Sequence, residues 1–135
     1  MSTADPRSAA ATSRAARTYR EEAVLTASRE KLVAMLCQRA IRDLESVVVA
    51  LEDPARRRAP ETGDGIARAH DVIAELRGAL DLDAGGELAE NLDSIYEFCL
   101  DRLTEANSSR EAQPIHHALT AVRPLEEAWR ELVPS

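Results

Sequence analysis

The chain has 135 residues and a mass of 14.8 kDa, which fits one domain and leaves no room for a second core. A hydrophobic content of 44% with 30% charged residues excludes a disordered tail, and an aromatic content of 3% argues against a β-sandwich or barrel. The net charge of −7 weighs against nucleic-acid binding, because phosphate contacts need a dense basic face. Alanine, leucine, arginine and glutamate dominate, and these good helix formers predict an all-α domain.

The N-terminal segment differs in character from the rest of the chain. Residues 1–17 are rich in Ala, Ser and Arg without apolar periodicity, which predicts a disordered, flexible arm. This arm has no apolar h-region, so we expect no secretory signal. Residues 18–27 then carry isolated apolar side chains that belong to no stripe, at Tyr19, Val24 and Leu25.

Helical periodicity begins after this segment. We expect the first helix to start with Ser28 as its N-cap, to carry an apolar stripe over 32–51, and to stop at Asp53-Pro54. The cluster over 62–65 (Thr-Gly-Asp-Gly) is typical of a turn. A second helix is predicted beyond it, with apolar residues alternating in steps of three and four over 66–80.

Two more amphipathic helices complete the pattern. A sharp connection is expected over 81–86, where paired glycines supply positive φ, and the third helix ends at 107–109. The fourth helix covers 115–132, with a kink expected just before Pro124. Short connections between amphipathic helices predict an antiparallel up-down four-helix bundle over residues 28–132.

The remaining polar features are interpreted as structural. Cys37 and Cys99 lie within apolar helical patterns, which predicts reduced, buried thiols and a reducing cytoplasm. No run approaches the ~20 apolar residues that a membrane span needs. The basic run over 56–58 is short, and we interpret it as part of a solvated loop.

No catalytic or metal site can be assembled from the sequence. His116 and His117 are adjacent, so on a helix they point about 100° apart and cannot chelate together. The segment from Asp81 opens like a calcium loop, but Leu92 stands where a bidentate glutamate is required. No nucleophile, base and orienting residue come together either. We therefore expect neither an enzyme nor a metal or cofactor.

An apolar surplus points instead to binding of another chain. Residues outside the helix stripes, including Val49, Val72, Leu82 and Phe98, would line an exposed groove suited to an amphipathic segment. The alternative, that they are scattered surface residues of the ordinary kind, stays open at this point.

Several segments, in order, resemble one known family. They are Tyr19-Arg20 with Val24 to Leu36, Leu76 to Asp81 with Gly85 to Tyr96, Leu103 with Ala106-Asn107, and Glu127-Ala128-Trp129. Together they resemble the FliS family, the flagellin-specific export chaperones of bacterial flagellar type III secretion. The chain departs from the family pattern at Arg29 (usually proline), Cys37 (usually tyrosine), Gln38 (usually an acid) and Pro124.

The resemblance implies a four-helix bundle that binds the disordered C-terminal region of flagellin in apolar grooves and prevents premature polymerisation. It also implies delivery to the cytoplasmic domain of the export gate, and a possible homodimer. The candidate flagellin-binding residues share an apolar character and a place on the helices, and each is equally compatible with the core: Ile66, Val72, Ile73, Leu88, Leu92, Tyr96, Leu119 and Val122.

Two hypotheses follow from the resemblance. Residues 18–27, with Tyr19, Val24 and Leu25, would form a self-capping segment that occupies the groove until flagellin displaces it. The alternative function is a self-associating helical bundle that binds a different secreted or regulatory protein.

Overall fold

The computed structural model describes residues 6–132, and the side chains of all of these except 6–11 and 22–28. Over this range the chain forms helices and no strands. The elements are α1 (Pro6–Glu52), α2 (Pro60–Gly78), α3 (Leu82–Ser109) and α4 (Gln113–Leu132). The predicted all-α class is therefore confirmed.

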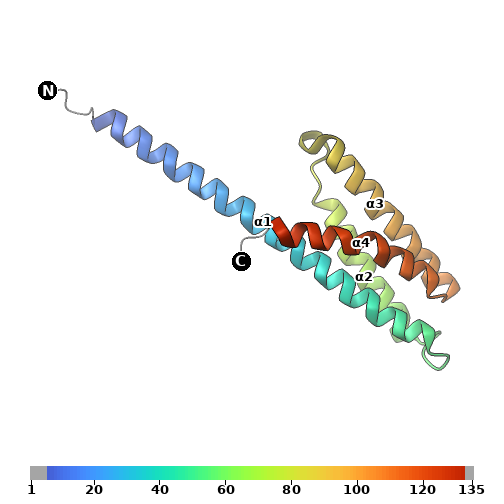
Figure 1. Ribbon diagram of the computed structural model, residues 1–135. Helices are drawn as coiled ribbons and strands as arrows, with labels where there is room; N and C mark the ends of the chain where they lie inside the picture. The colour runs from blue at the N-terminus through green and yellow to red at the C-terminus, as the bar shows by residue number, and fades with distance from the viewer. Residues whose placement is uncertain (1–5, 133–135) are drawn as a thin grey trace.

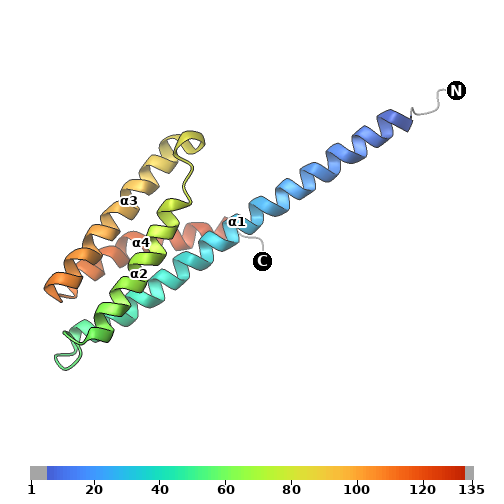
Figure 2. The ribbon, with the colours of Figure 1, turned by 180° about the vertical axis from the view of Figure 1, so that it is seen from behind.

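The four elements surround one core. α1 packs against α2 and α4, and α3 packs against the same two elements from the other side. Consecutive elements run in opposite directions, with the α1–α2 loop at one end of the bundle and the α2–α3 connection at the other (Figures 1 and 2). Two features depart from a simple bundle of four equal helices: α3 is broken at Gly86, which has φ 57° and ψ −141°, and α1 is much longer than the others.

The predicted start of the first helix at Ser28 is wrong. α1 has 47 residues, and its N-terminal part extends well beyond the other helices (Figure 1). Residues 6–17 are therefore helical where a disordered arm was expected, and residues 18–27 continue the same helix. The physical reason is that Ala, Arg and Glu have high helix propensity without any apolar stripe, and extending an existing helix carries no nucleation cost.

The turn predicted over residues 62–65 is also wrong, because α2 begins at Pro60 and these residues form its first turns. Both glycines there permit close approach of a neighbour. A Cβ on Gly63 would lie 2.8 Å from a terminal guanidinium nitrogen of Arg110, and one on Gly65 would lie 3.2 Å from Cγ2 of Val47. The glycines therefore serve packing of α2 rather than a turn.

The α1–α2 loop is held by two arginines. Nε of Arg57 donates to the carbonyl oxygen of Leu51 at 2.8 Å, at the end of α1. One guanidinium nitrogen of Arg110 donates to the carbonyl oxygens of Arg57 at 3.3 Å and Ala59 at 3.2 Å. Arg110 itself has φ 58°, the left-handed conformation that ends α3. The loop and the α3–α4 turn are thereby joined.

The connection between α2 and α3 is shorter than expected. α3 begins at Leu82, and Asp81 is its N-cap, with a side-chain oxygen that accepts from the backbone N–H of Ala84 at 3.0 Å. Of the paired glycines, Gly86 has positive φ and Gly85 does not. In α4, Pro124 lies on the exposed side, and the helix is not interrupted there.

The core contains both cysteines. Cys37 and Cys99 are free and fully buried, as the apolar pattern around them predicted. Burial raises the pKa of the Cys37 thiol to about 11, with a smaller contribution from the nearby Glu126 carboxylate, and raises that of Cys99 to about 12. Both side chains therefore pack as small, protonated apolar groups.

Candidate functional site

An apolar groove of about 200 Å³ lies where α2 ends and α3 begins. All four elements contribute to it, α1 through Val33 and α4 through Trp129. The only ionisable side chains in its lining are those of Asp81 and Tyr96. The lining residues are Val33, Leu76, Ala79, Leu80, Asp81, Gly85, Leu88, Ala89, Leu92, Tyr96 and Trp129.

The groove has a buried floor and an exposed rim. Leu76 and Tyr96 are almost fully buried, whereas Leu88 at the rim is 68% exposed. Leu82, six residues earlier on α3 and outside the lining, is 50% exposed. Covering a large aliphatic side chain completely contributes roughly 1.5–3 kcal/mol, so the rim offers apolar area to a bound chain.

The buried side chain of Tyr96 contributes a hydroxyl group to the floor of the groove. Burial, the largest cause, raises its pKa, and the nearby Cys37 and Cys99 thiols raise it further. A hydrogen bond with the side chain of Trp129 acts in the opposite direction but does not outweigh burial. The hydroxyl therefore stays protonated, and the floor of the groove is uncharged.

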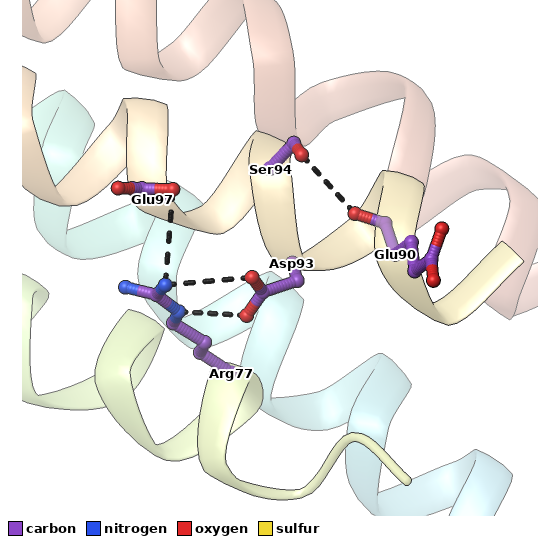
Figure 3. A network of polar contacts seen from close by, with 5 residues as sticks. All are labelled: Arg77, Glu90, Asp93, Ser94 and Glu97. Atoms are coloured by element: carbon purple, nitrogen blue, oxygen red, sulfur yellow. Dashed lines mark hydrogen bonds and ion pairs between the residues drawn. The ribbon is translucent and has the colours of Figure 1, made fainter. Parts of the chain in front are cut away.

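An ion-pair network joins α2 and α3 beside the groove (Figure 3). Nε of Arg77 contacts Oδ1 of Asp93 at 2.8 Å and a terminal nitrogen contacts Oδ2 at 3.4 Å, while Glu97 lies 3.8 Å from that nitrogen. The hydrogen bond to Asp93, the largest cause, raises the pKa of Arg77. Because Arg77 follows Leu76 and Asp93 follows Leu92, the bidentate pair holds together the two helices that line the groove.

The structure brings three of the predicted binding residues together in this groove: Leu88, Leu92 and Tyr96. The other five are at most 4% exposed and lie in the core: Ile66, Val72, Ile73, Leu119 and Val122. None of these five lines the groove, so their binding of flagellin stays a prediction. Of the residues named as apolar surplus, Val72 is also buried, whereas Val49 and Phe98 are exposed outside the groove.

Sequence reasoning missed most of the lining, since only three of its eleven residues had been predicted to bind. Val33, Leu76, Leu80 and Trp129 belong to regular apolar stripes, so nothing in their spacing distinguishes a groove wall from core. A usable signal was Trp129, the single tryptophan, because a large ring near a helix end often remains partly exposed.

The predicted capping residues are placed elsewhere. Tyr19 of α1 is 74% exposed and is not part of the groove lining, so it does not cover the groove in this arrangement. The N-terminal part of α1 extends past the other helices (Figure 2). The side chains of Val24 and Leu25 lie outside the described residues. Capping stays a prediction that requires the N-terminal part of α1 to fold back.

The described residues contain neither a candidate metal site nor a helix suited to crossing a membrane. No group of three or more His, Cys, Asp or Glu side chains in this part of the chain could hold a metal ion. Of the helices described, none combines the length and apolar character required to cross a bilayer.

Comparison with known proteins relates this chain to one family. Residues 11–135 match the family model described as "Flagellar protein FliS". The chain belongs to the FliS family. This confirms the resemblance that the sequence motifs indicated.

Individual FliS relatives match most of the chain. The flagellar secretion chaperone FliSB of Pseudomonas aeruginosa is 35% identical over 109 residues, covering 81% of this chain and 84% of its own. The flagellar secretion chaperone FliS of Vibrio cholerae is 32% identical over 108 residues, covering 80% and 77%. That of Salmonella typhimurium is 31% identical over 115 residues, covering 84% and 83%. FliS family membership supports a chaperone role in flagellar export.

Proposed function

We propose that this FliS family protein is a cytoplasmic export chaperone that binds the disordered C-terminal region of flagellin. It prevents premature polymerisation of flagellin and helps to deliver it to the flagellar type III export apparatus, through the cytoplasmic domain of the export gate. The bundle acts by binding and carries out no catalysis. The observation that carries the proposal is the apolar groove with its exposed rim at Leu88.

The groove suits an amphipathic segment that becomes helical on binding. Its walls come from four helices, so the occupant meets apolar side chains on several sides. Each anchor that becomes fully buried contributes roughly 1.5–3 kcal/mol, which is offset in part by the cost of ordering the bound segment. Several anchors at helical spacing are therefore needed, as in other helix-in-groove complexes.

Calorimetric titration with a peptide from the C-terminal region of the cognate flagellin tests this function. We expect saturable binding with a negative heat-capacity change, because apolar area leaves water. Replacing Leu88 with glutamate should weaken binding by about tenfold or more, since a charge would then lie on the apolar rim.

Val49→Glu provides the matched control. Val49 is 61% exposed on α1 and does not line the groove, so this variant carries the same new charge at a comparably exposed apolar position. Affinity within about twofold of the unchanged protein is expected for it. Equal losses in the two variants, or no binding by the unchanged protein, would contradict the proposed function.

A further inference from the structure

A second, larger pocket lies at the opposite end of α2 from the groove. Its volume is about 420 Å³, within the range of about 300–1,000 Å³ that is typical of ligand sites. It is formed by the last turns of α1, the α1–α2 loop and the first turns of α2. The apolar groove uses residues from Leu76 onward on α2, whereas this pocket ends at Arg68, so occupants of the two sites do not share a lining residue.

The pocket combines a buried floor with a charged rim. Val47 and Ala50 of α1 are each 4% exposed and contribute apolar surface below. Arg56 from the loop and Arg68 from α2 are exposed at the edge. Among the described residues neither guanidinium forms an ion pair or a side-chain hydrogen bond, in contrast to Arg57 and Arg110 nearby.

The rim is held in place by the fold. The hydroxyl of Thr62 donates to the backbone carbonyl oxygen of Arg56 at 2.7 Å and fixes the loop against α2. The guanidinium of Arg110 also holds this loop, by donating a hydrogen bond to the carbonyl oxygen of Ala59. Gly63 has no side chain and so leaves room for that guanidinium. A site whose backbone is already ordered loses less entropy when a ligand binds.

We propose that this pocket binds an acidic segment of a partner protein, with a side-chain carboxylate paired to Arg56 and Arg68. A guanidinium presents its N–H donors in a planar fork that matches a carboxylate. The floor at Val47 and Ala50 favours an aspartate or glutamate on a peptide, whose methylene stem has apolar surface, over a bare inorganic anion. The partner could bind while the groove holds its own occupant.

Glu61 sets the strength of this site. It is the third charged residue of the lining, so it opposes an incoming carboxylate and leaves the lining with one net positive charge. Removing its charge should therefore strengthen binding, opposite in sign to removal of the arginines. Opposite effects of removing Glu61 and of removing the arginines would show that the peptide binds within this lining, and not merely near a basic loop.

The test uses the full chain and a fluorescein-labelled hexaglutamate peptide, followed by fluorescence anisotropy. We expect saturable binding that weakens as salt is raised, since exposed charge pairs are screened. The double variant R56A/R68A should weaken it by about tenfold or more, and E61Q should strengthen it by about two- to threefold. The matched control is R58A, in the same loop but outside the pocket lining, with an expected change of less than about twofold.

Two comparisons define the ligand. A hexaglutamine peptide should not bind, and inorganic phosphate should compete only at concentrations far above those of the acidic peptide. Far-ultraviolet circular dichroism checks that each variant is folded, and the substituted side chains are all exposed. The proposal is overturned if hexaglutamate does not bind, if R58A loses as much as R56A/R68A, if E61Q weakens binding, or if phosphate competes as well as the peptide.

Discussion

Replacing Gly63 with alanine tests whether Arg110 holds the loop end of the bundle. In an unobstructed helix the change should stabilise the protein by about 1 kcal/mol, because glycine has more conformational freedom to lose. Here the new Cβ would lie 2.8 Å from Arg110, closer than atoms can approach, so the guanidinium must move. Its bonds to the carbonyl oxygens of Arg57 and Ala59 would then be lost.

The two effects differ in magnitude. Hydrogen bonds to a charged donor contribute roughly 1.5–3 kcal/mol each, and these two, at 3.3 and 3.2 Å near the surface, together contribute about 2 kcal/mol. G63A should therefore destabilise the protein by about 1 kcal/mol net. In a variant that carries R110G, which keeps the left-handed backbone but has no guanidinium, G63A should instead stabilise it by about 1 kcal/mol.

Urea unfolding of the four proteins, followed by circular dichroism, measures this double-mutant cycle. The expected signature is a change of sign between the two backgrounds with an unchanged m-value. If G63A alters stability by the same amount with and without Arg110, the reasoning from the close contact is refuted.

Two further predictions concern the core and the N-terminal segment. Folding raises the pKa values of the Cys37 and Cys99 thiols above their ordinary 9.0. The two protonated thiols therefore make their full contribution to the free energy of unfolding below about pH 9. This contribution is lost as the pH rises toward the thiol pKa values of the folded protein. The loss should reach about 1.4 kcal/mol per thiol at pH 10. The urea midpoint of the unchanged protein should therefore fall between pH 8 and pH 10, whereas the difference between these two midpoints should be smaller in C37A/C99A. A fall of equal size in C37A/C99A would contradict a role for the thiols. Deleting residues 1–25 should raise affinity for the flagellin peptide or promote aggregation if the segment is a cap. Unchanged affinity and solubility would reject self-capping.

The helical core could be predicted from the sequence, because burial imposes a strict spacing. The stripe over 32–51 and the stop at Glu52, directly before Asp53, were both found in the structure. The start of α1 could not be predicted in the same way. Residues 6–27 are helical because they have high helix propensity and continue the rest of α1. Neither cause produces a periodic pattern of apolar residues, so the pattern did not predict this part of the helix.

Glycine was ambiguous for a physical reason. Gly86 does adopt positive φ and breaks α3, as the paired glycines suggested. Gly63 and Gly65 have the same local sequence character but lie in a helix, where Arg110 and Val47 approach them. Only the tertiary neighbours decide between a turn and a close contact, and these neighbours come from distant parts of the chain.

The groove was only partly predictable from the same patterns. Leu88 and Leu92 lie one turn apart on α3, yet Leu88 is 68% exposed and Leu92 is 8% exposed. Their difference arises from the break at Gly86 and the end of α2, which leave the first turns of α3 uncovered. The hydrophobic pattern of a sequence shows which residues are apolar, but it does not show which of them is left uncovered by a neighbouring helix.

Site-specific photo-crosslinking tests the central claim most directly. A benzoylphenylalanine residue in place of Leu88 would lie at the rim of the groove, and one in place of Val49 would lie on the exposed side of α1. With the C-terminal flagellin peptide bound, we predict strong crosslinking from position 88 and none above background from position 49. Crosslinking from position 49 alone, or equally from both positions, would contradict binding in the groove.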